Sequence, residues 1–570
     1  MKWLLPGLFA TAVCVACGGN DRTQGRSVLL ITLDTTRADA LGAYGGPAGA
    51  TPVMDALAAK SIVYDAAYTV TPLTQPSHAS LLTGLYPPRH GIRMNGIGSL
   101  SPQAETLAEK AKEAGYQTAA SVGALVLDPA FGLDQGFEQY TAPRPVVGSE
   151  DSHVEERRAQ EVVNDALAWF EARDRDRPYF LWTHFFDPHG PYAPPPQFRL
   201  GKAMKTLYQG EVAYTDRQIG RLLEALQSVP PEQAPVVVIV ADHGEAFGEH
   251  GEQTHGTFCY DPTIRIPLIV HHPDGHRAGE RSDEVVSIVD LFPTLAEAMG
   301  LRVSKVDGRS FFREPLQDDH GVYFESYYGY LAYGTSPLAG WIDANGKYIH
   351  SSQPEFFAGG DHAEEQDLAR QSADGLAPYR KALERFSGID SLPVSRTAAS
   401  SELTDELQDL GYAAAGAEAD DLPAPLDAGG RPSPKDIIGA INDTLLAQEL
   451  SNQGEFERSE ELLWNVVSQL PRNYFALDRL ATALMRQGRF DEAIPHLRRV
   501  VADGPGWPGS WFNLGACLIE TGQREQALDP LRRAVALKPT EELFRRVLLE
   551  TLRAAGLEEE ASSVERQLGG

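Results

Sequence analysis

The chain has 570 residues, of which 42% are hydrophobic, and its formal net charge at pH 7 is −29. This length exceeds that of one ordinary domain, and the hydrophobic fraction is that of a globular protein, which excludes a disordered or fibrous chain. The excess of negative charge disfavours binding to nucleic acid or to anionic lipid by the protein as a whole, although a local basic pocket is compatible with it.

The first residues predict export and lipid anchoring. Lys2 precedes an apolar run over residues 3–16, which is shorter than the roughly 20 residues of a membrane-spanning helix and suits a signal peptide. The small residues, Cys17 and the Gly/Asn stretch after it resemble the lipobox of bacterial lipoproteins. We therefore predict a signal peptide over residues 1–16 and an acylated Cys17. The alternatives are an ordinary cleaved signal and a buried hydrophobic terminus. The prediction places the protein in the bacterial cell envelope, on the periplasmic side or at the outer membrane, with the lipid as its only membrane contact.

Short apolar runs alternate with amphipathic stretches from residue 27 to about residue 390. The predicted buried strands are residues 28–33, 179–182 and 236–240, and the predicted helices are residues 106–114, 154–172 and 210–226. Such alternation predicts an α/β fold with a mostly parallel sheet and helices on both faces. In this kind of fold, ligands bind beyond the carboxyl ends of the strands.

Asp and His residues follow all three predicted strands. They are Asp34 after the first strand, His184, Asp187 and His189 after the second, and Asp242 and His243 after the third. A single Asp after a strand is commonly no more than a helix cap. Three such clusters at one edge of a sheet instead predict a metal site or a site of acid–base chemistry.

The segment from Thr71 to Gly91 carries the clearest motif. Its part from Thr74 to Gly84 resembles the sulfatase signature, in which Cys or Ser is followed by x-Pro-Ser-Arg and a Ser-Leu-Leu-Thr-Gly helix. The flanking motifs also occur in the sulfatase order: Leu33-Asp34, Pro188-His189, Asp242-His243-Gly244, Arg265-Ile-Pro-Leu268 and Asp290-Leu-Phe-Pro-Thr-Leu295. The resemblance covers about residues 27–390. It implies the alkaline phosphatase superfamily fold and an enzyme that hydrolyses or transfers sulfate or phosphate esters, with an anionic ester as substrate.

Two residues within this segment depart from the sulfatase signature. Sulfatases oxidise their signature Cys or Ser to formylglycine, whereas oxidation of Thr74 would give a ketone and no aldehyde. His78 stands in the position of the signature Arg, and the pattern Thr-x-Pro-x-His resembles the nucleotide pyrophosphatase/phosphodiesterase branch. In that branch and in the phosphoethanolamine transferases, a metal-bound threonine attacks phosphorus. Thr74 is therefore the predicted nucleophile, with a plain helix N-cap as the alternative.

The resemblance also implies the metal ligands. It places them at Asp34, Thr74, Asp242 and His243. Typical sulfatases have two Asp residues after the first strand and bind calcium, but the second of these is Thr35 here. Loss of one carboxylate beside an imidazole ligand favours zinc or manganese over calcium.

Further histidines are candidates for catalysis. His78, His189 and His255 complete the predicted catalytic set with Thr74. His189 and His255 could bind a second metal, position the anion or protonate the leaving oxygen, and ordinary surface histidines are the alternative. Asp187 and His250 are weaker candidates, whereas a structural role is predicted for His90.

The C-terminal part shows an internal repeat. Glycines at 454, 488, 522 and 556 and prolines at 471, 505 and 539 recur at intervals of 34 residues. This period and the residues around Trp511 and Gly515 resemble tetratricopeptide repeats, in which two antiparallel helices form each unit. We predict the array at residues 435–570, ending in a capping helix pair, with a protein or peptide as partner. Residues 413–434 have the composition of a linker, which leaves residues 27–412 as the sulfatase-like domain.

Three hypotheses for function follow. The first is an exported sulfatase-like hydrolase or transferase with a metal-activated Thr74. The second is a phosphodiesterase or an enzyme like the phosphoethanolamine transferases. The third is a catalytically inactive scaffold that binds partners through its repeats.

Cys259 and Cys517 are predicted to be small buried residues without a disulfide.

Overall fold

The computed structural model describes residues 25–143, 156–312, 320–371, 373–394, 422–503, 507–539 and 541–568. The predicted signal peptide, Cys17 and residues 413–421 of the predicted linker lie outside the described residues. Within the described ranges, no helix combines the length and the apolar character that a membrane span requires. Cys259 and Cys517 are buried and unpaired, as predicted.

The central sheet has eight strands in the order β5–β4–β6–β1–β7–β8–β2–β9. Their bounds are β5 Gln139–Thr141, β4 Gln117–Val122, β6 Tyr179–Phe185, β1 Val28–Leu33, β7 Val236–Ala241, β8 Leu268–His271, β2 Ile62–Tyr64 and β9 Arg281–Ser282. In the described chain β8 alone runs antiparallel to its neighbours, so the prediction of a mostly parallel sheet is confirmed. The strand predicted at residues 179–182 continues to Phe185, which places His184 within β6.

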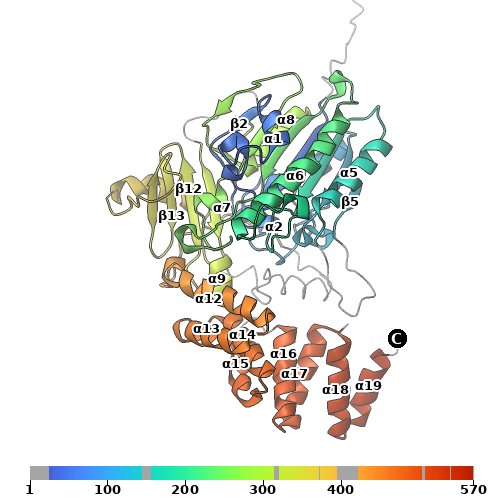
Figure 1. Ribbon diagram of the computed structural model, residues 1–570, viewed down its shortest axis with the longest axis vertical. Coiled ribbons are helices and arrows are strands. Elements are labelled where there is room, and N and C mark those ends of the chain that lie inside the picture. Colours follow the sequence, from blue (N-terminus) through green and yellow to red (C-terminus); the bar gives the residue numbers. More distant parts are fainter. Residues whose placement is uncertain are drawn as a thin grey trace, which may run out of the picture.

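Helices cover both faces of this sheet (Figure 1). The helices α1 Pro52–Ala58, α5 Ala159–Ala172 and α6 Met204–Leu226 pack together on one face, and α2 Thr74–Thr83, α4 Leu107–Glu113 and α8 Leu291–Ala298 pack together on the other. The helix predicted at residues 210–226 begins earlier, at Met204. Its first turns are held by Tyr208, whose hydroxyl donates to Thr35 O and accepts from Arg37 N. The helix predicted at residues 154–172 begins at Ala159.

A second, smaller sheet was not predicted. It is an antiparallel meander of β11 Val322–Ser326, β12 Leu338–Asp343, β13 Gly346–His350 and β14 Glu355–Ala358. The backbone N–H of Glu325 donates to Val70 O and so joins β11 to the segment that precedes α2. Helix α10, Ala377–Glu384, packs on β12. The short strands β3 Ala67–Tyr68 and β10 Val286–Ser287 form a separate pair.

The C-terminal part is an array of helices, as predicted. Its members are α12 Pro434–Asn452, α13 Phe456–Gln469, α14 Tyr474–Arg486, α15 Phe490–Asp503, α16 Pro508–Glu520, α17 Arg524–Leu537, α18 Glu542–Ala554 and α19 Glu558–Leu568. Each helix packs on the next. The glycines that recur every 34 residues have φ between 74° and 81°, a left-handed conformation that glycine adopts without steric cost. A Cβ at Gly515 would lie 2.7 Å from Leu531, so the close approach of α16 and α17 requires glycine there.

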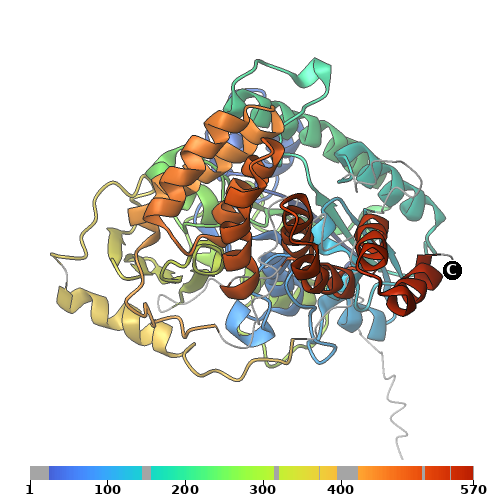
Figure 2. The same ribbon diagram turned by 90° about the horizontal axis from the view of Figure 1, so that it is seen from below.

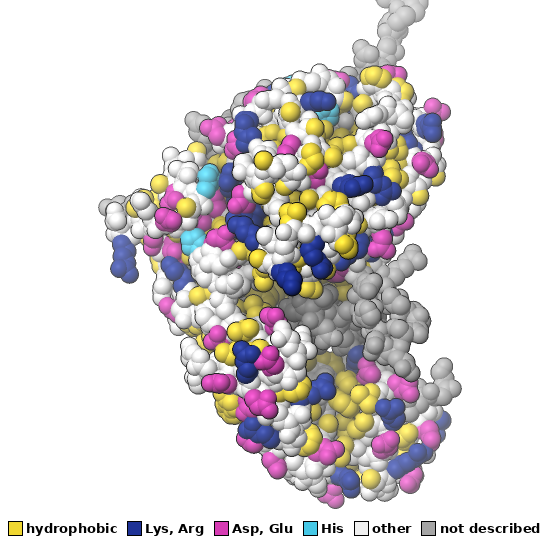
Figure 3. Space-filling model, viewed as in Figure 1, with side chains coloured by type: hydrophobic (Ala, Val, Ile, Leu, Met, Phe, Trp, Pro, Cys, Tyr) yellow, Lys and Arg dark blue, Asp and Glu magenta, His cyan; other side chains and the backbone are white. Residues whose placement is uncertain are grey.

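The first helix of the array packs against the sheet domain. Ile437 and Ile441 of α12 form a buried cluster with Tyr333 of α9, Tyr328–Tyr333. Asn442 Nδ2 donates to Gly251 O across 2.7 Å. The loop after β7 therefore touches the repeats directly. Seen from below, the array lies across the sheet domain (Figure 2). Acidic and basic side chains are scattered over the visible face of both parts (Figure 3).

Candidate active site

The register of three parallel strands brings the predicted clusters together. Leu33 at the end of β1 pairs with Phe185 of β6 and with Ala241 of β7. Asp34 N donates to Phe185 O across 2.9 Å. On the other side, Asp242 N donates to Leu33 O across 3.1 Å. Asp34 and Asp242 therefore leave the sheet side by side, and both are fully buried.

Three side chains at this edge have the geometry of a metal site. Asp34, Asp242 and His243 each offer a ligand atom within 4.8 Å of the others. His243 Nε2 lies 3.6 Å from Asp34 Oδ1 and 3.8 Å from Asp242 Oδ2. Ligands bound at about 2.0 to 2.4 Å to one divalent ion lie within roughly 4 to 5 Å of each other. These residues therefore fit a single divalent cation.

The chemistry of this donor set also fits a cation. Three carboxylate oxygens have no hydrogen-bond partner among the described residues: both oxygens of Asp34, and Oδ2 of Asp242. Burial raises the pKa of Asp34, and burial together with the neighbouring Asp34 carboxylate raises the pKa of Asp242 well above its ordinary value. Two adjacent buried carboxylates are costly unless a positive charge compensates them. His243 Nδ1 donates to Gly244 O across 3.0 Å, which leaves the lone pair of Nε2 for a metal.

Thr74 lies at the edge of this group. Its Oγ1 is 3.3 Å from His243 Nε2. Thr74 is the first residue of α2, after Leu73 as the N-cap residue, and its side chain makes no capping hydrogen bond. The alternative that Thr74 is a plain N-cap is therefore wrong. Gln75 N donates to Asn95 Oδ1 across 2.8 Å, so another side chain satisfies a free N–H of this helix end.

A buried hydroxyl behind the site fixes two histidines. Thr32 Oγ1 lies 2.9 Å from Trp182 Nε1, 3.1 Å from His78 Nε2 and 3.0 Å from His184 Nδ1. His78 Nδ1 donates to Thr74 O across 2.8 Å, so its Nε2 accepts the one hydroxyl proton of Thr32. The Thr32 oxygen then accepts from Trp182 and from His184 Nδ1.

This network determines what His184 presents to the site. With its proton on Nδ1, His184 turns a lone pair at Nε2 toward Asp34 Oδ2, 3.4 Å away. Among the described residues, His184 Nε2 has no hydrogen-bond partner. Burial lowers the pKa of both His184 and His78 to about 3, so both rings are neutral. His184 therefore adds a fourth unsatisfied electron-pair donor to the site. The sequence places it in the cluster after the second strand, but outside the predicted ligand set.

His255 and His189 form the opposite wall. Their ring centroids are 5.3 Å apart, and the His255 ring lies 4.5 Å from that of His243. Although burial lowers it, the pKa of His255 is raised overall by the Glu245 carboxylate, whose Oε1 is 3.0 Å from His255 Nδ1. Burial lowers the pKa of His189 to about 4, and its Nδ1 donates to Gly190 O across 2.7 Å. Of the two, His255 is the better proton donor.

The weaker candidates lie outside this constellation. Asp187 accepts from Ala159 N and pairs with Arg158, which anchors the start of α5. His250 has φ 52° and its ring stacks on Tyr260. His90 is hydrogen-bonded to Ser80 and accepts from Ile92 N, in agreement with the predicted structural role.

Comparisons with known proteins support the resemblance in both parts of the chain. Residues 26–301 match the sulfatase family model, and residues 479–542 match the tetratricopeptide repeat model. Residues 26–301 are therefore a sulfatase-family hydrolase domain. An arylsulfatase of Clostridium perfringens is 23% identical, in an alignment that covers 57% of this chain and 86% of that enzyme.

Two further relatives show how broad the likeness is. The human N-acetylgalactosamine-6-sulfatase is 27% identical, and the alignment covers 50% of this chain but only 64% of that enzyme. A solved phosphonate monoester hydrolase of Agrobacterium radiobacter superposes with a TM-score of 0.54 at 21% identity, covering 63% of this chain and 95% of that one. At this identity, the superposition establishes the fold of the domain.

We expect Thr32→Val to destabilise the sulfatase domain by about 2 to 4 kcal/mol, because it leaves the buried donors and acceptors of Trp182, His78 and His184 without a partner. The measurement is the shift of the urea unfolding transition, followed by tryptophan fluorescence. Thr183→Val is the matched control, since the Thr183 hydroxyl is buried without a partner among the described residues. That variant should match or exceed the wild type, and equal losses in both variants would contradict the proposed network.

Proposed function

We propose that Thr74 is a metal-activated nucleophile that cleaves phosphate esters, in an exported enzyme of the sulfatase family. The observation that carries this proposal is the position of Thr74 Oγ1, 3.3 Å from His243 Nε2 in the group that includes Asp34 and Asp242. A divalent metal held by these four residues would lower the pKa of the Thr74 hydroxyl and neutralise the non-bridging oxygens of the ester. The burial of the group supports this, because charges interact more strongly where water is excluded.

Phosphate is favoured over sulfate by the identity of the nucleophile. Residue 74 is a threonine, whose oxidation cannot give the aldehyde of formylglycine, so the hydroxyl itself must attack. The relatives named arylsulfatase and N-acetylgalactosamine-6-sulfatase favour a sulfate ester. The structural relative named phosphonate monoester hydrolase supports phosphorus chemistry on the same fold. A phosphate monoester or diester is the substrate class that satisfies both the fold and the nucleophile.

The proposed reaction has two steps. In the first, Thr74 Oγ1 loses its proton to solvent and forms a bond to phosphorus. At the same time the bond from phosphorus to the leaving oxygen breaks, and His255 donates a proton to that oxygen. In the second, water attacks phosphorus and gives a proton to His255, while the bond from phosphorus to Thr74 breaks and Thr74 Oγ1 regains a proton from solvent. An acceptor hydroxyl in place of water would make the enzyme a transferase. Glu245 supports the first step because its carboxylate favours the protonated form of His255.

The other two histidines are proposed to act differently. His189 presents a lone pair at Nε2 in its neutral form, which suits metal ligation or proton acceptance better than donation to an anion. His78 lies behind Thr74 and holds its carbonyl oxygen, so we assign it a positioning role in place of the predicted direct one. Both assignments depend on which ring nitrogen carries the proton. The carbonyl oxygens of Gly190 and Thr74 accept from Nδ1 of His189 and of His78, so each Nε2 is left without a proton.

We expect Thr74→Ala to lower kcat by about 10³-fold or more, because it removes the attacking oxygen, whereas Thr74→Ser should retain activity. The assay uses p-nitrophenyl phosphate, bis-p-nitrophenyl phosphate and p-nitrophenyl sulfate, and mass spectrometry of a quenched reaction should find phosphothreonine at residue 74. Thr83→Ala, at the far end of the same helix, is the control. Turnover of the sulfate ester alone would refute the phosphoryl assignment, and no turnover with any metal would favour the scaffold hypothesis.

We expect purified protein to contain about one zinc or manganese ion per chain, as measured by inductively coupled plasma mass spectrometry. Chelation should lower the melting temperature, since it leaves the Asp34 and Asp242 carboxylates uncompensated. Asp242→Asn should lose the metal. Asp187→Asn should keep it, because Asp187 is buried but pairs with Arg158. Calcium as the bound ion would contradict the proposed preference.

The same proposal places the enzyme in the cell envelope through an acylated Cys17. We expect Cys17→Ser to abolish incorporation of labelled palmitate in a bacterial host, because the variant lacks the thiol that is acylated. Cys259→Ser should leave the label unchanged, since Cys259 is fully buried in the folded domain. Equal labelling of the wild type and Cys17→Ser would exclude a lipoprotein.

A protein or peptide stays the predicted partner of the tetratricopeptide array. The contact of Asn442 with Gly251 joins α12 to the loop that also carries His243 and His255. A partner held by the array would therefore be close to the proposed catalytic residues.

A further inference from the structure

A polar cavity lies at the edge of the sheet opposite to the candidate active site. It is formed at the amino ends of β1, β6 and β7, where Ser27, Tyr179 and the loop that contains Glu232 meet. Its volume is about 120 Å³, which exceeds the roughly 30 Å³ that one water molecule occupies in the liquid. Because the six residues of β1 separate the two edges, the cavity is about 20 Å from the Asp34 group and independent of it.

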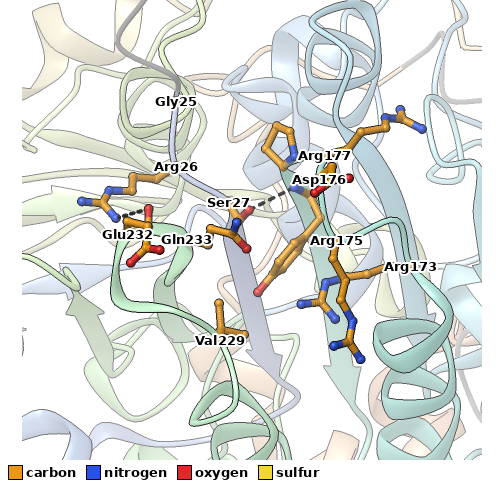
Figure 4. Close-up of a pocket in the computed structure, with 12 residues that line it drawn as sticks. Gly25, Arg26, Ser27, Arg173, Arg175, Asp176, Arg177, Val229, Glu232 and Gln233 are labelled. Carbon is orange, nitrogen blue, oxygen red and sulfur yellow. Dashed lines mark hydrogen bonds between the residues drawn. The ribbon is translucent and has the colours of Figure 1, made fainter.

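Two arginines on one wall of this cavity have no counter-charge. The side chains of Arg173 and Arg175 lie next to each other there, while Arg26 and Glu232 lie on the opposite wall (Figure 4). Among the described residues, no carboxylate oxygen lies within 4.0 Å of Arg173 or Arg175, whereas Arg26 pairs with Asp274. The chain has 79 Asp and Glu residues against 50 Lys and Arg residues. Two neighbouring guanidinium groups without a carboxylate partner therefore give this wall of the cavity a local positive charge, in a protein whose net charge is negative.

A buried hydroxyl in the same cavity also lacks a partner. Tyr179 lines the cavity and is only 3% exposed, yet its hydroxyl has no hydrogen-bond partner among the described residues. The Arg173 guanidinium lies 5.4 Å from the centre of the Tyr179 ring. Burial and the charge of Arg175 lower the pKa of Arg173, as expected for a cation without its counter-ion. An unsatisfied buried donor beside two unpaired cations suits an anion that accepts hydrogen bonds.

We propose that this cavity binds a phosphate-class oxyanion, with Arg173 and Arg175 supplying the positive charge and the Tyr179 hydroxyl donating a hydrogen bond. Guanidinium groups bind phosphate through paired N–H donors. Asp176 and Glu232 also line the cavity but form no ion pair with either arginine. Arg173 stacks on the Phe170 ring at 3.6 Å and donates from Nη1 to Phe170 O, so its remaining N–H groups are the donors proposed for the anion.

The place of the cavity in the chain favours a lipid headgroup as the source of the phosphate. Gly25, the first described residue, lines the cavity, and Cys17 precedes it by eight residues. Eight residues span at most about 29 Å. If Cys17 carries a lipid, this edge of the sheet lies close to the membrane surface. The headgroup phosphate and a free phosphate ester share the same chemistry, so the two sources must be separated by experiment.

The test is isothermal titration calorimetry on the full chain after chelation, so that a metal in the candidate active site cannot hold the anion. Inorganic phosphate and short-chain dihexanoylphosphatidylglycerol, used below its micellar concentration, are the two probes. We expect both to bind the wild type. Arg173→Ala/Arg175→Ala should weaken both by roughly tenfold or more, and Tyr179→Phe, which removes only a hydroxyl, should weaken them about fivefold.

The control is Arg472→Ala/Arg524→Ala, which removes the same charge from the repeats and should leave binding unchanged. Tighter binding of the lipid than of phosphate would support a headgroup site, and the reverse order would support a soluble phosphate ester at the same site. No binding to the wild type would overturn the proposal, as would equal weakening by the cavity variant and the control. Tyr179→Phe keeps the test decisive if the double variant fails to fold.

Discussion

Two carboxylates that the sheet places side by side determine most of what this site can do. Asp34 and Asp242 follow neighbouring parallel strands at the same register, and both are fully buried. Their mutual repulsion and their loss of hydration both favour the protonated acids, which would be poor ligands. A bound cation reverses this preference and makes the pair a stabilising feature of the fold. Metal binding and folding are therefore coupled at the centre of the domain.

The network around Thr32 shows how the fold keeps neutral imidazoles next to these charges. His78 and His184 both have a pKa of about 3, so neither compensates the carboxylates. Their protons are directed by the Thr32 hydroxyl and by the carbonyl of Thr74. The lone pair of His184 Nε2 therefore faces Asp34, and the lone pair of His78 Nε2 faces the Thr32 hydroxyl. The protonated Nδ1 of His78, by contrast, lies 3.7 Å from Asp242 Oδ2. His255, whose pKa is raised, stands opposite.

The parts of this architecture that depend on local pattern could be predicted from the sequence. The apolar runs at β1 and β7 and the 34-residue spacing of the glycines each determine an element without help from distant residues. Asp34, Asp242 and His243 follow the strand ends directly, so the parallel sheet was enough to bring them together. The motif at Thr74 came from the family resemblance.

Other features depend on tertiary contacts and escaped prediction. Thr183 and His184 are polar and end the apolar run at Trp182, but pairing with β1 and β4 extends β6 beyond it. Thr32 stands within an apolar run and looks like an ordinary β-branched strand residue, yet it organises three side chains. Glu245 acts only because the loop after β7 folds back to bring His255 against it. The meander of β11–β14 consists of short strands whose pairing is set by the turns between them.

The orientation of the parallel strands gives the domain two chemically different edges. At the carboxyl edge, Asp34 and Asp242 concentrate negative charge that requires a cation. An anionic ester would be repelled there unless that cation were bound. At the amino edge, Arg173 and Arg175 leave positive charge uncompensated, so an anion can be held there by the protein alone. The chain enters the sheet at the amino edge through Gly25, and the repeats touch the loop at the carboxyl edge through Asn442. Attachment at one edge and partner binding at the other would orient the proposed catalytic residues away from the point of attachment, toward whatever the repeats hold.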